Sequence, residues 1–158
     1  MITCIFEKGT KAHLRHAVVD VLVLKEDKIL LVRRTKRLLE GGKWGLVGGY
    51  VERTENLQEA AEREIFEETG YKIRDLTLLT IRHNADRPHE DRQNISFVFF
   101  CKALEKEGTA DGESDERRWF GFDELPSEEN LAFDHPLNIK LYLQYRKENF
   151  PLPVFKLR

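Results

Sequence analysis

The sequence predicts an α/β fold in which a mixed β-sheet is sandwiched between helices. Two observations indicate this class: apolar runs of strand length recur along most of the chain, and one early and one late helical pattern accompany them. The length of 158 residues suits one domain with a sizeable core. We therefore expect residues 1–158 to form a single domain, with a hairpin at 1–15 and a tail at 148–158 as peripheral extensions.

The first predicted strands pair as two hairpins. Residues 2–6 and the stretch up to Arg15 fit a short edge hairpin, because Lys8 and Gly9 are turn residues. Residues 17–24 and 29–32 are almost continuous aliphatic runs with a polar turn between them. Such runs are typical of buried strands.

Three more strands are expected in the second half of the chain. Residues 76–83 alternate enough for a strand, and residues 94–104 contain three phenylalanines, which favour a central, well-buried strand. Residues 117–122 predict a shorter one. These strands would complete the sheet.

A late helix and an apolar tail end the chain. The helix is predicted at residues 136–147, where Leu137, Leu141 and Tyr145 lie at i, i+4 spacing and form a face that can cover the sheet. Residues 150–155 are apolar but contain prolines. The tail therefore either straps across its own domain or contacts a partner chain.

The early helix carries the functional signal. Asn56 and Glu59 fit a helix start in which each side chain satisfies an end amide of the other, and Gly70 fits the C-terminal stop. The apolar stripe of this helix consists of Leu57, Ala61 and Ile65. At about 100° per residue, Glu64, Glu67 and Glu68 overlap the edge of that stripe. Three carboxylates are thus expected partly in the core-facing half.

This placement of acids is costly. Glu64 and Glu68 are a like-charge i, i+4 pair that repels by about 0.2–0.5 kcal/mol. Desolvation adds to that cost. A hard divalent cation, Mg²⁺ or Mn²⁺, would offset it because such ions prefer oxygen ligands. The alternative is a solvated acidic face, which is the commoner arrangement for helices rich in glutamate.

The segment that includes this helix resembles the Nudix box. In that motif a glycine is followed after five residues by a glutamate, and after seven more by Arg-Glu-aliphatic-x-Glu-Glu-x-Gly-apolar. The matching positions are Gly49, Glu55, Arg63, Glu64, Ile65, Glu67, Glu68, Gly70 and Tyr71. The run before it is similar to the Trp-Gly-Leu-Pro-Gly-Gly of the family, with Val47 in place of proline. The resemblance covers roughly residues 16–147 and implies a Nudix-type α/β/α sandwich.

The resemblance also implies a reaction. Water would attack a phosphorus of the diphosphate bridge in a nucleoside diphosphate linked to a further group, and Mg²⁺ or Mn²⁺ would neutralise the phosphates and activate the water. Glu64, Glu67 and Glu68 would be the metal ligands, with Glu52 as a further candidate. Glu116, three residues before a tryptophan in a late strand, and Glu67 are the two candidates for the general base.

Other site residues follow from the same resemblance. Arg63 and Glu55 are expected to brace the loop as an ion pair, while Gly49 and Gly70 serve its geometry. The candidate substrate contacts are Arg34, Trp44, Arg92 and His135. Each has a plainer alternative: a solvated basic cluster, core packing, a solvent-facing loop, and a helix cap or surface histidine, respectively.

The substrate expected from the resemblance is an ADP-sugar. Leu-Ala-Phe-Asp-His at 131–135 and Asp-Arg-Gln-Asn at 91–94 are similar to segments of the ADP-ribose pyrophosphatase-like branch, which implies cleavage of ADP-ribose to AMP and a sugar phosphate. One alternative is a house-cleaning pyrophosphohydrolase for oxidised nucleoside triphosphates. Another is a non-catalytic nucleotide-sensing Nudix-like module.

The amino-acid composition limits the partners and the cellular compartment that we expect. Hydrophobic residues at 41% and charged residues at 34% are typical of soluble proteins, and a net charge of −2 gives no general attraction to nucleic acid or membrane. Cys4 and Cys101 form no zinc-binding pattern. Neither a signal peptide nor an apolar run near ~20 residues is present. We expect a cytoplasmic protein with a small nucleotide substrate and no nucleic-acid or membrane partner; a homodimer is left open.

Overall fold

The computed structural model describes residues 2–87, 89–90, 92–110 and 114–155. In these residues a two-stranded sheet consists of β1 (Ile2–Ile5) and β2 (Lys11–Leu14). The larger sheet contains seven strands: β3 (Ala17–Lys25), β4 (Lys28–Arg34), β5 (Trp44–Gly45), β6 (Val47–Tyr50), β7 (Tyr71–Arg82), β8 (Ile95–Lys106) and β9 (Ser114–Gly121). The helices are α1 (Leu57–Thr69), α2 (His135–Glu148) and a 3₁₀ turn at Glu128–Asn130.

The larger sheet is mixed, as predicted. Its main order is β5-β4-β3-β8-β7, with β6 paired to β3 and β9 paired to β4. β3 and β8 run parallel, whereas β3 with β4 and β7 with β8 are antiparallel. The strand rich in phenylalanine is therefore central, as expected. This order brings β3, β6 and β7 next to α1.

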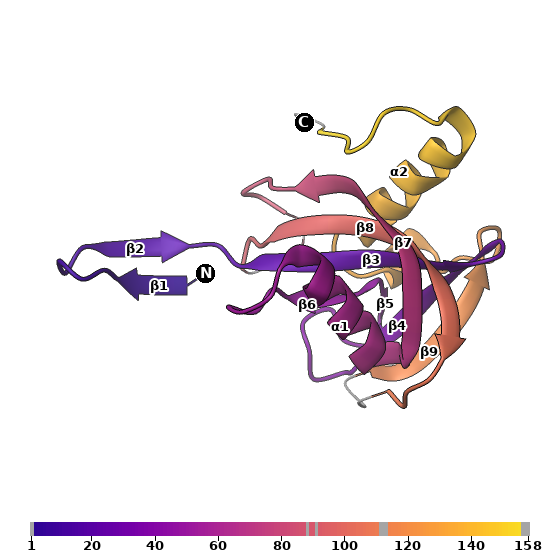
Figure 1. The fold of residues 1–158 in the computed structure, drawn as a ribbon, viewed down its shortest axis with the longest axis horizontal. Coiled ribbons are helices and arrows are strands. Elements are labelled where there is room, and N and C mark those ends of the chain that lie inside the picture. The colour runs from indigo at the N-terminus through magenta and orange to yellow at the C-terminus, as the bar shows by residue number, and fades with distance from the viewer. Residues whose placement is uncertain (1, 88, 91, 111–113, 156–158) are drawn as a thin grey trace.

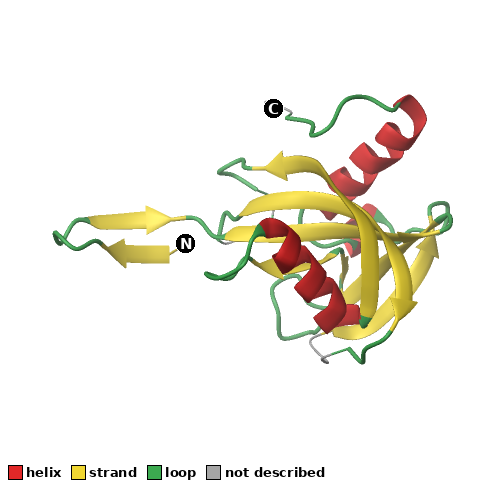
Figure 2. Cartoon of the chain, in the orientation of Figure 1, coloured by secondary structure: helices red, strands yellow, loops and turns green. Residues whose placement is uncertain are grey.

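The helices cover opposite faces of this sheet (Figures 1 and 2). Alternate residues of β3 divide between two cores because side chains of a strand point to opposite faces. Val19 and Val21 pack with Ile65 of α1, and Leu22 packs with Ile139 of α2. The expected α/β/α sandwich is thus confirmed. None of the helices in the described residues is long and apolar enough to cross a membrane.

The start and end of α1 match the sequence signals. The Asn56 side chain accepts from the N–H groups of Gln58 and Glu59 at 2.9 and 3.0 Å, and the Asn56 N–H donates to Glu59 Oε2 at 2.8 Å. Gly70 has a φ of 76°, in the left-handed region that favours glycine. The capping box and the glycine stop therefore set the limits of α1.

Two strands begin well before their predicted starts. β7 begins at Tyr71 rather than at 76, because the chain pairs with Lys106 of β8 as soon as Gly70 has ended the helix. β9 begins at Ser114 rather than at 117, because Ser114 pairs with Arg34. In both cases pairing with a distant strand extends a segment whose own pattern is weak.

The two peripheral segments behave differently. The β1–β2 hairpin projects from the side of the larger sheet (Figure 2). The tail lies along β7, where the Val154 N–H donates to the Leu79 carbonyl at 2.8 Å and the Thr80 hydroxyl donates to the Val154 carbonyl. Of the two alternatives for the tail, the strap across its own chain is the one observed.

Candidate active site

A cavity of about 460 Å³ opens beside α1. It is bounded by residues of β3, β4, β6 and α1, by the loop before β8 and by the segment before α2. Its charged and histidine lining residues are Asp20, Arg34, Glu52, Arg63, Glu64, Glu67, Glu68, Arg87, Glu90, Arg92 and His135. All four predicted metal ligands and three of the four predicted substrate contacts therefore meet in one place.

The three carboxylates of α1 differ in environment. The Glu64 side chain is 14% exposed and accepts from Arg63 Nη1 at 2.9 Å, whereas Glu67 is 48% exposed and accepts from the same nitrogen at 3.0 Å. Glu68 accepts from the Gly48 N–H at 3.4 Å. The exposure of these acids therefore differs: the Glu64 side chain is mostly buried, whereas the Glu67 side chain is about half exposed. The sequence had suggested that all three lie partly toward the core.

Arg63 joins the loop before α1 to the helix. Its Nε and Nη2 donate to the two Glu55 oxygens at 2.9 and 2.7 Å, and Nη2 also donates to the Tyr50 carbonyl at 3.0 Å. These hydrogen bonds lower the pKa of the Glu55 carboxyl to about 2. The Glu52 N–H donates to Glu55 at 2.7 Å, so one ion pair holds the loop that carries Glu52.

Gly49 leaves the space that Glu64 occupies. A Cβ added at Gly49 would collide with the Glu64 carboxylate. Because Gly49 belongs to β6 and Glu64 to α1, a side chain at position 49 would push the acid away from the sheet. The glycine therefore allows the helix carboxylate to approach the sheet backbone closely.

A buried polar chain forms part of the cavity wall. Within it, His135 Nδ1 accepts from the Leu46 N–H at 3.0 Å, so a ring proton lies on Nε2, which is 3.4 Å from Asp20 Oδ1. The Ser96 hydroxyl donates to the other Asp20 oxygen. Burial by itself would raise the pKa of Asp20, but His135 and Arg87 outweigh it and hold that pKa at about 2. His135 is 3% exposed, so the surface position considered from the sequence is wrong.

A second buried pair links the loop before β8 to the start of α2. Arg87 Nε and Nη2 donate to the two Asp134 oxygens at 3.0 and 2.6 Å, and both side chains are 4% exposed. Sequence reasoning missed this pair, since its members are far apart in the chain. The aspartate next to a helix start was the available signal, but it favours a cap.

Two arginine–aromatic pairs complete the cavity. The Arg34 guanidinium lies 4.8 Å from the Phe133 ring centroid, and its Nε donates to the Leu39 carbonyl at 2.9 Å. Arg92 donates to the Tyr50 hydroxyl, with its guanidinium 5.8 Å from that ring. Phe133 and Tyr50 were not predicted as contacts. Both are suited to stack on a planar group.

Comparison with known proteins identifies the family. Residues 14–142 match the family model of the NUDIX domain. The chain belongs to the Nudix family. It is a hydrolase of pyrophosphate bonds, and its α1 with the preceding loop is the Nudix box of that family.

Three relatives illustrate the likeness. An ADP-ribose pyrophosphatase of Methanocaldococcus jannaschii is 36% identical over 140 residues, covering 88% of this chain and 80% of the relative. An oxidized purine nucleoside triphosphate hydrolase of Danio rerio is 33% identical over 136 residues, covering 80% and 83%. A bifunctional NMN adenylyltransferase/ADP ribose pyrophosphatase of Francisella tularensis, solved with AMP and a Mn ion, superposes with a TM-score of 0.66 at 26% identity, covering 83% of this chain and 42% of that one.

The acidic end of the cavity suits the divalent metals that Nudix hydrolases use. Its donors are carboxylate oxygens from Glu52, Glu64, Glu67 and Glu68, a set that fits Mg²⁺ or Mn²⁺ better than a softer ion. In the described residues no three histidine, cysteine, aspartate or glutamate side chains converge as metal ligands. Instead, Arg63 holds Glu64 and Glu67 at hydrogen-bonding distance.

Two predicted site residues lie outside the Nudix cavity. Trp44 packs edge-on against Phe120, with ring centroids 4.9 Å apart, which is the packing alternative. Glu116 lies 3.6 Å from Arg33, and both side chains are about half exposed. A bulge explains this: Arg34 pairs with Ser114 but Arg33 pairs with Glu116, so Ser114 shares the cavity face of Arg34 and Glu116 shares the other face.

Arg15 holds the loop that lines the cavity opposite α1. Its guanidinium donates to the carbonyls of His83, at 2.7 Å, Asn84, at 2.9 Å, Asn94, at 3.1 Å, and Gln93. These carbonyls lie at the two ends of the segment that carries Arg87, Glu90 and Arg92. One side chain therefore closes the base of a loop that lines the cavity.

Arg15→Gln is expected to loosen that loop, because glutamine cannot reach four acceptors at once. We expect KM to rise about tenfold, equivalent to about 1.4 kcal/mol, with a much smaller change in kcat. Proteolytic cleavage within residues 83–94 should also accelerate. Lys11→Gln, at an exposed position of the same hairpin, is the control. Unchanged KM and unchanged cleavage in Arg15→Gln would contradict this role.

Proposed function

We propose that this Nudix hydrolase cleaves the diphosphate bond of an ADP-sugar such as ADP-ribose, giving AMP and a sugar phosphate. One observation carries the proposal: a single cavity joins a carboxylate end to two arginine–aromatic pairs. A nucleoside diphosphate linked to a sugar needs both parts of the cavity. Its phosphates require metal cations, which the carboxylates would hold, and its base requires an aromatic or guanidinium group to stack on.

The carboxylate end would hold the metal. Glu64, Glu67 and Glu68 are the proposed ligands of Mg²⁺ or Mn²⁺, with Glu52 as a helper; bound cations neutralise the diphosphate and lower the pKa of bound water. Arg63 donates hydrogen bonds to Glu64 and Glu67 and so holds both carboxylates in the cavity lining. The Mn ion named with the Francisella tularensis structure supports this choice of metal.

Glu67 is the general base that we propose. It lines the cavity, whereas Glu116 does not. Its carboxylate is half exposed, so attacking water can reach it and the accepted proton can leave to solvent. A base must lie within hydrogen-bond reach of the water whose proton it takes. We therefore propose Glu67 rather than Glu116 for that role.

The other end of the cavity suits the nucleoside. Leu38 and Leu39 line it and are 42% and 46% exposed, so they present apolar surface that a ligand can contact. Together with the Arg34–Phe133 pair they offer an apolar and cationic surface for adenine. The Arg92–Tyr50 pair, elsewhere in the lining, would contact the sugar on the other side of the diphosphate.

A steady-state panel tests the substrate. With Mg²⁺ or Mn²⁺ present, ADP-ribose should show a kcat/KM at least about tenfold above that of nucleoside triphosphates, a difference of about 1.4 kcal/mol. The products should be AMP and ribose 5-phosphate. An ADP-ribose rate no better than the triphosphate rate would overturn the assignment.

A second candidate is hydrolysis of oxidised purine nucleoside triphosphates. The Danio rerio relative favours it, because this chain covers most of that protein at a similar identity. The two reactions differ in product: release of inorganic pyrophosphate from an oxidised triphosphate identifies the second one. The cytoplasmic location, the single domain and a homodimer stay predictions.

A further inference from the structure

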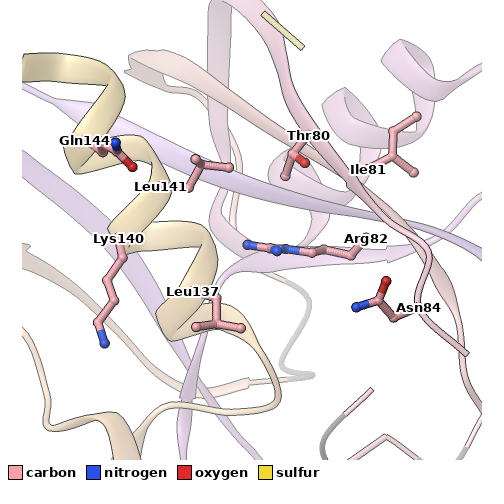
Figure 3. Close-up of a pocket in the computed structure, with 8 residues that line it drawn as sticks. All are labelled: Thr80, Ile81, Arg82, Asn84, Leu137, Lys140, Leu141 and Gln144. Atoms are coloured by element: carbon pink, nitrogen blue, oxygen red, sulfur yellow. The ribbon is translucent and has the colours of Figure 1, made fainter. Parts of the chain in front are cut away.

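A second cavity, of about 260 Å³, lies between α2 and β7 (Figure 3). Its lining shares no residue with the cavity beside α1. The polar residues that line it are Thr80, Arg82, Asn84, Lys140 and Gln144, and Leu137 and Leu141 form its apolar wall on α2. The lining residues of this cavity in the described chain include two cations and no acid, although the chain as a whole is slightly acidic.

Arg82 is the centre of this second cavity. Its side chain extends from β7 toward α2, and the guanidinium lies between Leu137 and Leu141 in the view of Figure 3. Its Nε donates to Asn138 Oδ1 at 2.7 Å. Among the described residues the two Nη groups donate no hydrogen bond and contact no carboxylate. The nearby acid, Asp134, is already bound by Arg87.

In the described residues this arrangement leaves a half-buried cation with no carboxylate in direct contact; the charge of Asp134 acts on it only from a distance. Burial lowers the pKa of Arg82, which shows that the surroundings disfavour its charge. Desolvating an unpaired charge costs free energy. Asn138, which is fully buried beside Arg82, also has an Nδ2 without a hydrogen-bond partner in the described residues. Asn138 does not itself line the cavity. The Arg82 Nη groups do face it and are donors, so the ligand that suits them is an acceptor.

The rim and the volume limit the ligand. Lys140 pairs with Glu128 at 2.7 Å, but both side chains are 59% or more exposed, so that ion pair is weak and exchangeable. A volume of about 260 Å³ is below the ~300–1,000 Å³ of pockets for drug-sized molecules. The space therefore suits an anionic group with a few carbon atoms.

We propose that this cavity binds a small organic anion, a carboxylate or phosphate monoester, through the Nη groups of Arg82. Guanidinium pairs with either group in a bidentate manner. Lys140 supplies a second positive charge at the rim, and Leu137 and Leu141 contact the carbon body. This binding is independent of the substrate assigned to the Nudix cavity.

The test uses the full-length, isotopically labelled chain with metal removed by chelation. Glycerol 3-phosphate and succinate are titrated separately, with sodium chloride at matched ionic strength, while NMR follows the Asn138 side-chain amide. At least one probe should give a saturable shift that chloride does not reproduce. A response to glycerol 3-phosphate alone identifies a phosphate monoester as the preferred group, and a response to succinate alone identifies a carboxylate. Either response supports the site.

Variants on β7 decide whether Arg82 is responsible. Arg82→Gln should weaken binding of the responding probe by at least about tenfold, a loss of about 1.4 kcal/mol. Arg74→Gln, at a 63% exposed position of the same strand, should change it less than about twofold. If Arg82→Gln does not fold, Arg82→Lys replaces it. Lysine should weaken binding severalfold, because its ammonium group cannot donate the two parallel hydrogen bonds of a guanidinium. Shifts equal to those with chloride, or unaltered binding in the Arg82 variant, would overturn the proposal.

Discussion

Glu67→Gln is expected to lower kcat for ADP-ribose by about 10²–10⁴-fold, the range for loss of a positioned general base. The substitution keeps the size of the side chain but removes its charge and its capacity to accept a proton. Because Glu67 is half exposed, the fold should tolerate the change. The measurement is steady-state turnover with Mg²⁺ or Mn²⁺ for wild type and variant, together with the melting temperature.

Two matched variants make this result specific. Glu62→Gln changes an exposed glutamate of the same helix that does not line the cavity, so its kcat should stay within about twofold of wild type. Glu116→Gln should also have a small effect, because that side chain faces Arg33 outside the cavity. A larger loss in Glu116→Gln than in Glu67→Gln would show that the late strand supplies the base.

Asp134→Ala is expected to cause the largest loss of stability, about 3–5 kcal/mol. It removes the carboxylate that accepts two hydrogen bonds from buried Arg87 and leaves that charge only the longer contact with Glu90, at 3.7 Å. For a chain of this size that corresponds to a fall in melting temperature of roughly 6–20 °C. The loss is not that of a helix cap, since the Asp134 side chain makes no capping hydrogen bond to α2. Denaturant and thermal unfolding followed by circular dichroism measure it.

An exposed ion pair provides the comparison for Asp134. Lys72 and Glu107 are 2.7 Å apart, but their side chains are 57% and 50% exposed. Glu107→Ala should therefore cost only about 0–1 kcal/mol. If the two substitutions proved equally mild, the buried pair would have no special role in linking the loop before β8 to α2.

Local signals predicted the Nudix box closely. Asn56, Glu59 and Gly70 act within a turn or two of their own positions, so the sequence places the ends of α1 without knowledge of the rest of the fold. The same holds for the spacing that sets Glu64, Glu67 and Glu68 along one helix. The strand ends were less accurate, because β7 and β9 are extended by partners that the local pattern does not contain.

By itself, the sequence determined the α/β class, the helix with its caps, and the acidic motif that points to metal-dependent hydrolysis. Only the tertiary structure decided which residues that are far apart in the chain come into contact. These are the Arg87–Asp134 pair, the His135–Asp20 contact and the Arg34–Phe133 pair. It also decided the face of Glu116, through one bulge between β4 and β9. The physical reason is the separation along the sequence of the residues that interact. Helix caps and apolar periodicity depend on residues that are near one another in the chain. Burial and strand pairing depend on strand register and on segments that are far apart.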